Sequence, residues 1–198
     1  MAKLFDLKEL KENFVTPASS GILKDNFLDQ HCARIESIKQ LSGKLPGDGE
    51  IFFLWSLNSF NAFTFIPYII KEQGIIHELV LSTYSISSRI LNAVTHYLEK
   101  GKIEKIHILV SDSIKFRIPK VQDQLIVLVN QRPGQFSVGY GWNHSKVMCI
   151  RTKDGNFVVE GSGNFSENAQ YEQYIFINNK TVYDFRRDSV LAIFAGSN

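Results

Sequence analysis

The chain has 198 residues, enough for one α/β domain or for one domain with an appendage. Its 44% hydrophobic and 21% charged residues are typical of a globular protein and exclude disorder along the whole chain. The formal net charge of +2 is too small to indicate nucleic-acid binding by itself. The two cysteines, Cys32 and Cys149, form no CxxC pair, which favours a reduced, cytoplasmic protein.

The first part of the chain is predicted to be a helical appendage. Residues 4–14 have helical spacing of apolar side chains, and those of 26–41 can share one face of a second helix. The turn at 45–49 then separates this part from the rest of the chain. We therefore expect an N-terminal helical extension over 1–46 and a single α/β domain over 47–198.

From residue 50 onward, strand-like and helix-like segments alternate. Strands are expected over 50–57, 76–82 and 103–110, and helices over 59–72, 85–100 and 119–130. This order implies a parallel or mixed sheet covered on both faces. The apolar stretch 51–70 approaches the length of a membrane span, but its Ser, Asn, Thr and Pro residues would be costly in hydrocarbon. We expect a buried strand and helix there, with no membrane insertion.

After Pro133-Gly134 the predicted elements are mostly short strands. They comprise a strand at 136–141, a hairpin of 146–151 with 157–160, a strand at 172–178 and a closing helix at 182–194. The hairpin prediction depends on Asp154-Gly155, because Asp-Gly between two apolar strands is a strong turn signal.

The side chains that indicate chemistry lie beyond the strand at 136–141. His144 and Lys146 are two residues apart at the start of a predicted strand, so both side chains project from the same face. After the hairpin, an antiparallel return brings the Gly-Ser-Gly-Asn turn beside them. Its glycines allow close backbone approach, and Ser162 and Asn164 offer hydrogen-bond donors.

This set of side chains suits a phosphodiester substrate. A lysine and an amide donor can neutralise and orient the non-bridging oxygens, and a neutral imidazole can attack phosphorus to form a covalent intermediate. A second, protonated imidazole must then protonate the leaving oxygen, because one histidine cannot hold both roles in the same step. Glu172, downstream of the turn, can orient an imidazole by accepting a hydrogen bond from its other nitrogen.

In this order the residues resemble the HxK…GSxN signature of the phospholipase D superfamily. The signature reads His144-Ser145-Lys146 and then Gly161-Ser162-Gly163-Asn164, and Phe165-Ser166 and Glu172 also fit the pattern. The resemblance implies a phospholipase D-like sandwich, in which a mixed β-sheet is flanked by helices on both faces. The order of strands and helices from about residue 50 is compatible with that fold.

The resemblance also implies a roughly symmetrical site made from two such motifs. This chain has one copy, which is similar to short members, among them small bacterial endonucleases, that form homodimers. His144 would then be the nucleophile in one subunit and the general acid in the other. Lys146 and Asn164 would bind phosphate oxygens. Ser162 would support that network, and Glu172 would orient histidine. Neither a metal nor another cofactor is implied.

One position departs from the family pattern. The extended motif continues HxK with four residues and an Asp, and that position is Arg151 here. Arg151 is either an extra cation beside the phosphate or a surface residue at the far end of its strand. We favour the second interpretation. The family's Asp is a supporting residue and not the nucleophile, so its loss weakens the catalytic interpretation without removing it.

Further candidates lie beyond the strand that ends near Val110. In α/β sheets, ligands gather outside the carboxyl ends of the strands, so Lys115 and Arg117 are candidate substrate-binding residues that would guide an extended polyanion. A solvated loop explains them equally well. Three aromatic residues can stack on bases or pack around the cleft, and the second interpretation is favoured: Tyr84, Tyr140 and Trp142.

The sequence therefore predicts a metal-independent phosphodiesterase, a nuclease that works through a phosphohistidine in a composite homodimer site. Nucleic acid is the expected substrate because the chain is a small, mildly basic domain that looks like single-motif endonucleases. Two alternatives stay open. One is a lipid phosphodiesterase acting on phospholipid. The other is a catalytically silent nucleic-acid-binding or assembly module, for which Arg151 is the only hint.

Overall fold

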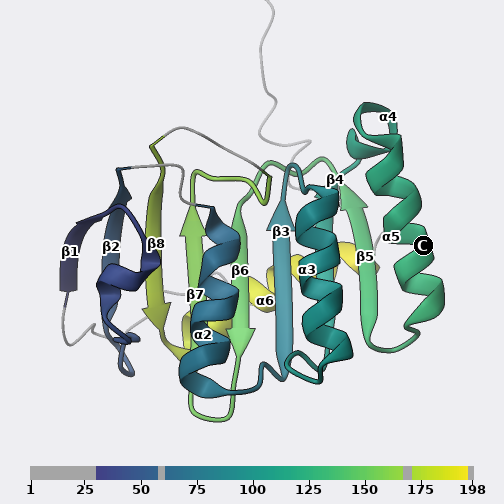
Figure 1. Ribbon diagram of the computed structural model, residues 1–198. Coiled ribbons are helices and arrows are strands. Elements are labelled where there is room, and N and C mark those ends of the chain that lie inside the picture. The colour runs from purple at the N-terminus through teal and green to yellow at the C-terminus, as the bar shows by residue number, and fades with distance from the viewer. Residues whose placement is uncertain (1–29, 58–60, 167–170, 196–198) are drawn as a thin grey trace, which may run out of the picture.

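The computed structural model describes residues 30–57, 61–166 and 171–195, which form one mixed sheet with helices on both faces (Figure 1). The eight strands have the order β1-β2-β8-β7-β6-β3-β4-β5. β1–β2 and β3–β4–β5 are parallel, whereas β8, β7 and β6 pair antiparallel with their neighbours. This architecture confirms the predicted α/β class with its mixed sheet.

The elements have nearly the predicted order. The strands are β1 (Gln30–Ile35), β2 (Ile51–Ser56), β3 (Glu78–Thr83), β4 (Ile106–Ser111), β5 (Phe136–Gly141), β6 (Val147–Arg151), β7 (Asn156–Gly161) and β8 (Gln173–Asn178). The helices are η1 (Ile38–Leu41), η2 (Ala62–Thr64), α2 (Phe65–Gln73), α3 (Ser88–Glu99), α4 (Ile114–Arg117), α5 (Pro119–Gln131) and α6 (Lys180–Ala195).

The helix predicted over 26–41 is wrong in its described part. Residues 30–35 form β1, which runs parallel to β2 with Gln30 beside Ile51 and Ile35 beside Ser56. Only the short turn η1 (Ile38–Leu41) is helical. Pairing with β2 satisfies the backbone groups on the inner side of β1, and this tertiary contact outweighs the helical spacing of the apolar residues. The helix predicted over 4–14 lies outside the described residues, and the boundary at residue 46 stays a prediction.

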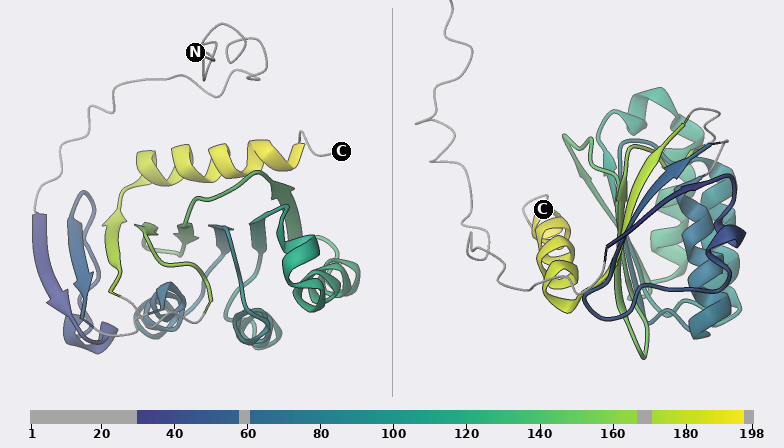
Figure 2. Two further views of the ribbon diagram at one scale, coloured as in Figure 1. Left: turned by 90° about the horizontal axis from the view of Figure 1, so that it is seen from above. Right: turned by 90° about the vertical axis from the view of Figure 1, so that its left-hand side faces the viewer.

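Two apolar cores lie on the two faces of the sheet. Figure 2 shows α2, α3 and α5 on one face and α6 alone on the other. The larger core packs beneath the three helices, with Phe65, Leu91 and Leu125 among its buried residues. The smaller core joins α6 to the sheet through Tyr183 and Val190. The region 51–70 contains β2, η2 and most of α2, as expected for a buried strand and helix.

Among the described residues, no helix is both long enough and apolar enough to cross a membrane.

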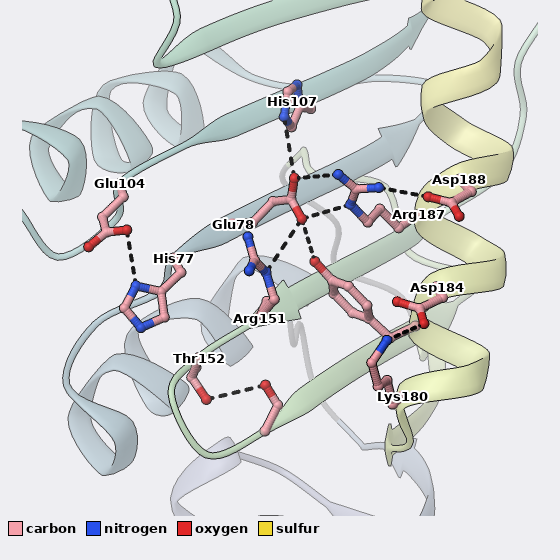
Figure 3. A network of polar contacts seen from close by, with 12 residues as sticks. His77, Glu78, Glu104, His107, Arg151, Thr152, Lys180, Asp184, Arg187 and Asp188 are labelled. Carbon is pink, nitrogen blue, oxygen red and sulfur yellow. Dashed lines mark hydrogen bonds and ion pairs between the residues drawn. The ribbon is translucent and has the colours of Figure 1, made fainter.

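A charged network fixes α6 to the sheet (Figure 3). Glu78 on β3 is buried, and its carboxylate accepts hydrogen bonds from Arg187 at 2.7 and 3.0 Å and from Tyr183 at 2.8 Å. His107 and Arg151 lie 3.7 and 3.6 Å from the same carboxylate. Burial alone would raise the pKa of Glu78, but its hydrogen-bond donors outweigh burial and hold the pKa well below the ordinary range.

The same network accounts for Arg151. It ends β6, whereas Lys146 directly precedes the first residue of that strand. Its side chain is half exposed and faces Glu78, its cross-strand partner on β3. Arg151 therefore lies at the far end of its strand, as the favoured interpretation predicted, and it takes part in the ion-pair network that holds α6.

Candidate functional site

The His144–Lys146 segment forms the loop between β5 and β6. Both residues precede β6, because the strand begins at Val147, one residue later than the sequence pattern predicted. Lys146 Nζ nevertheless lies 3.0 Å from His144 Nδ1 and donates a 2.7 Å hydrogen bond to the His144 carbonyl oxygen. The imidazole and the ammonium group are therefore brought together, and the His144 side chain is exposed to solvent.

Two residues that the sequence analysis did not single out hold this loop. Asn143 Nδ2 donates to Ser82 Oγ at 3.0 Å and to the Thr83 carbonyl at 3.1 Å. Asn143 Oδ1 accepts hydrogen bonds from the backbone and hydroxyl of Ser145 at 3.0 and 2.7 Å. Ser145 Oγ also lies 2.5 Å from Ser82 Oγ. His144 is therefore flanked by two anchors that attach it to the end of β3.

The Gly-Ser-Gly-Asn turn returns beside Lys146, as predicted. Glu160 pairs with Val147, and the Gly161 amide donates a 3.2 Å hydrogen bond to the Lys146 carbonyl. A Cβ atom at Gly161 would lie 2.4 Å from the Gln173 carbonyl oxygen, so only glycine fits between β7 and β8. The close approach expected of these glycines is therefore present in the structure.

Ser162, which is exposed, and Glu172, which is buried, form a polar pair next to this turn. The Ser162 hydroxyl donates a hydrogen bond to the Glu172 carboxylate and accepts one from the Gln173 amide at 3.1 Å. Glu172 is 6% exposed. Its backbone is fixed to β2, because its amide donates to Ser56 Oγ and its carbonyl accepts from the Ser56 amide, both at 2.8 Å.

Asn164 is attached to the same end of β3 as Asn143. Its Oδ1 lies 3.4 Å from the Thr83 hydroxyl, and the adjacent Phe165 amide lies 3.4 Å from that hydroxyl as well. Phe165 is buried and forms a bridge with Ile86. Thr83 thus links the Asn164 segment to the His144 loop, since its carbonyl accepts the hydrogen bond from Asn143.

The electrostatic surroundings of Lys146 are mixed. Burial lowers its pKa, because a partly enclosed ammonium group loses hydration. The charges of Glu172 and the Tyr84 phenol act in the opposite direction, but burial dominates and the pKa lies below its ordinary value. Lys146 is therefore an ammonium group whose charge is opposed by burial and favoured by Glu172.

A row of cations and aromatic rings extends from His144. The His144 and Tyr84 ring centroids are 4.9 Å apart, and the Arg117 guanidinium lies 4.4 Å from the Tyr84 centroid. Lys115 Nζ lies 4.5 Å from the centroid of Tyr140. Both cations belong to α4, which lies at the edge of the sheet reached by the arrowheads of β3 and β5 (Figure 1). The structure therefore brings Arg117 next to a ring that contacts His144.

A cleft of about 1080 Å³ opens at the site and continues over the sheet on the α6 side. His144, Lys146 and Ser162 line one part of it. The other part is lined by strand residues that include Arg34, Phe53, Trp55 and Ile175. Phe53, Trp55 and Ile175 are exposed although they are large and apolar.

Within the described residues, no group of three or more His, Cys, Asp or Glu side chains is arranged to hold a metal ion. Metal-independent chemistry stays a prediction.

The sequence matches no protein-family profile and no curated protein. Solved structures do match. Polyphosphate kinase from Porphyromonas gingivalis has a TM-score of 0.52 at 16% identity, with 75% of this chain and 26% of that chain covered. Phosphatidylserine synthase from Haemophilus influenzae Rd KW20 has a TM-score of 0.48 at 16% identity, with 75% of this chain and 41% of that chain covered.

The chain has a phospholipase D-like fold. This confirms the fold expected from the HxK…GSxN signature. The chain spans about a quarter of the matched kinase and about two fifths of the matched synthase. At this low identity the phospholipase D-like fold is what the likeness shows, so the activity, the substrate and the partners are matters for proposal.

Proposed function

We propose that the protein is a metal-independent phosphodiesterase, a nuclease that acts through a phosphohistidine intermediate in a site shared by two copies of the chain. One observation carries the proposal: Lys146 Nζ lies 3.0 Å from His144 Nδ1, in a loop that pairs directly with the Gly-Ser-Gly-Asn turn. A nucleophile, a cation and phosphate-binding donors are thereby brought together by the hairpin of β6 and β7.

The first half-reaction uses the residues of one subunit. A phosphodiester oxygen draws Lys146 away from Nδ1, so the imidazole can carry its proton on Nδ1 and attack phosphorus through Nε2. The new N–P bond replaces the P–O bond to the leaving alcohol. Lys146 and the Asn164 amide neutralise and orient the phosphoryl oxygens. Glu172 orients the imidazole, and Ser162 holds the Glu172 carboxylate in place.

A second imidazole completes the reaction. The departing oxygen takes a proton from the imidazolium of the partner copy's His144, which becomes neutral. That neutral imidazole then removes a proton from water as the water attacks phosphorus. The N–P bond breaks, and both histidines return to their starting protonation states. A single copy of His144 cannot act as nucleophile and as acid at the same moment, so the proposed site needs two chains.

An exposed sheet face beside the site supports dimerisation. Phe53, Trp55 and Ile175 are exposed on β2 and β8 and line the same cleft as His144. Phe185 on neighbouring α6 is also exposed. Contiguous exposed apolar residues are typical of protein interfaces. A second copy packed on this face would bury these residues and bring its own His144 toward the cleft.

The test is cleavage of labelled single- and double-stranded DNA and RNA in EDTA, with the wild type beside His144→Ala and Lys153→Ala. Lys153 belongs to the β6–β7 turn at the far end of β6, so its loss should leave the rate unchanged. We expect EDTA-resistant cleavage that falls by at least about 10³-fold in His144→Ala, the scale for loss of a nucleophile. Cleavage that requires a divalent metal, or that survives His144→Ala, would overturn the mechanism.

A trapping experiment tests the intermediate directly. A ³²P-labelled substrate quenched in alkali should leave label on the wild-type chain and none on His144→Ala, because phosphohistidine survives base. Label that survives acid and is lost in base would indicate another nucleophile.

A further inference from the structure

Two aromatic side chains at the site end of the sheet are almost fully exposed. Trp142 comes directly after β5 and is 98% exposed, and Phe116 on α4 is 85% exposed. β4 and β5 are parallel neighbours, and the Asp112 amide just beyond β4 donates a 2.9 Å hydrogen bond to the Gly141 carbonyl. Trp142 therefore leaves the sheet at the same edge as α4 and lies two residues before His144.

Two cations at this edge lie against the faces of tyrosine rings. Lys115 lies over Tyr140 and Arg117 over Tyr84, so neither of these two rings is a fully open surface for a ligand. Trp142 and Phe116 are the rings with open faces. This edge therefore carries two kinds of surface. Lys115 and Arg117 are cations held against tyrosine rings, and Trp142 and Phe116 are exposed rings that a ligand can cover.

We propose that this edge binds a single-stranded nucleic acid, with unpaired bases stacked on Trp142 and Phe116 and phosphates bound by Lys115 and Arg117. The proposal rests on the proposed function, since it places the scissile phosphate at His144. Arg117 lies one ring beyond His144, on Tyr84, which is a suitable place for the phosphate next to the reacting one.

The interleaving of charge and aromatic surface favours nucleic acid over a lipid surface. Phe116 stands between Lys115 and Arg117 in the chain, and Asp112 pairs with Lys115 at 3.3 Å. A membrane-binding face needs a continuous apolar area, whereas stacked bases need separate rings with cations between them. In a duplex, stacking on the neighbouring base pairs hides the faces of the bases, so open aromatic rings select unpaired strands.

A binding experiment on the inactive His144→Ala chain tests this without requiring cleavage. The sequence has two tryptophans, so a Trp55→Phe exchange leaves Trp142 as the single tryptophan, which is excited selectively beyond the absorption of tyrosine. The probes are an oligothymidylate, an abasic oligonucleotide of equal length, and vesicles of phosphatidylcholine with phosphatidylglycerol. We expect oligothymidylate to quench Trp142 fluorescence and to bind about tenfold more tightly than the abasic strand, the scale of one base–aromatic stack.

Two substitutions in the His144→Ala chain, with its native Trp55, separate stacking from charge. Trp142→Ala should weaken oligothymidylate binding about tenfold while leaving the abasic strand unaffected, as should Phe116→Ala to a smaller extent. Arg117→Ala should weaken binding of both strands. It should also reduce the magnitude of the slope of log K against log salt concentration by about 0.7. Ile126→Ala on α5 and Lys153→Ala are the matched exposed controls, and neither should change binding.

Each contrary result identifies its own cause. Equal affinity for both strands without quenching would overturn base stacking, and EDTA-resistant cleavage by the wild type would show that the phosphodiesterase proposal still stands. A blue shift of Trp142 on vesicles without oligonucleotide binding would overturn the proposal in favour of a membrane surface.

Discussion

Lys146 is the residue at which opposing electrostatic effects meet. Burial lowers its pKa, while the negative charge of Glu172 raises it. Its ammonium group must be charged to bind phosphate oxygens, so the pH at which Lys146 loses its proton should limit activity on the alkaline side. The Ser162 hydroxyl holds the carboxylate that sustains this charge.

Replacing Glu172 with Gln removes the charge that raises the pKa of Lys146. That pKa should fall further, so the alkaline limb of the pH profile of kcat/KM should move to lower pH. The rate at neutral pH should also fall about tenfold or more, because the imidazole loses the carboxylate that we propose to orient it. Glu99→Gln, in an exposed pair with Arg132, is the control and should leave the profile in place. An unmoved alkaline limb in Glu172→Gln would show that Lys146 does not set it.

Gly161 offers a test of the close packing at the turn. A methyl group there would lie 2.4 Å from a backbone oxygen of β8, which cannot move without breaking the sheet. We expect Gly161→Ala to lower the free energy of unfolding by about 2 kcal/mol, the scale of overpacking, and to displace Ser162 and reduce activity. Urea unfolding measures the first effect. Gly47→Ala, which would meet only the flexible Glu50 side chain at 3.4 Å, should be almost neutral.

At the level of elements, Glu78 is the buried carboxylate that joins α6 to the sheet. Glu78 accepts hydrogen bonds from Arg187 and Tyr183, both on α6, and it also faces Arg151 of β6 (Figure 3). A buried carboxylate with several donors stabilises its folded state only while it is ionised. The α6 face of the sheet, and with it one wall of the cleft, should therefore be sensitive to acid.

Glu78→Gln should lower the free energy of unfolding by about 3 kcal/mol at pH 7, the lower end of the range for breaking a buried ion pair. The folded-state pKa is depressed and the unfolded-state value is about 4.3. The stabilisation is therefore present above about pH 4.3, and it is lost as the pH falls through the lower folded-state value. Urea titrations of both proteins at several pH values measure this. The exposed Glu104→Gln should change little, and a difference that stays constant down to low pH would contradict the assignment.

The elements also show where sequence reasoning succeeds and fails. The predicted bounds of β5 match the observed ones, and the hairpin around Asp154-Gly155 is present, because local turn chemistry and apolar patterning determine both. β1 differs from the predicted helix because only its pairing with β2 distinguishes the two possibilities. α4 escapes prediction because one short turn of Ile-Lys-Phe-Arg has too little periodicity to detect.

Within the site, the motif residues are predictable, and their supports are not. His144, Lys146 and Ser162 stand in a recognisable order in the sequence. Asn143 anchors the His144 loop to Ser82, 61 residues earlier, and no spacing rule links two such distant positions. An Asn immediately before the HxK segment is the only available signal. The connection from Arg117 through Tyr84 to His144 likewise depends on three segments that are far apart in the sequence.

For the whole molecule, the exposed apolar face on β2 and β8 matters most. Trp55→Glu should convert the proposed dimer to a monomer and abolish cleavage, since a desolvated charge opposes association. Sedimentation velocity and the cleavage assay measure the two effects together. Val127→Glu on α5 is the matched control, because Val127 is 47% exposed and Trp55 is 48% exposed. A monomeric wild type with full activity would rule out the composite site.

The attachment of Glu172 to Ser56 also bears on when the protein becomes active. This hydrogen bond joins residues 116 positions apart, and β8, the last described strand in chain order, lies between β2 and β7 in the sheet. Contacts of such large sequence separation form late, because the entropy of closing a long loop opposes them. A ribosome-bound chain that ends before β8 would carry His144 and Lys146 without the carboxylate beside them. The proposed activity would then appear only after β8 has been made and has paired with β2, so the catalytic groups come together only in a chain whose sheet is assembled.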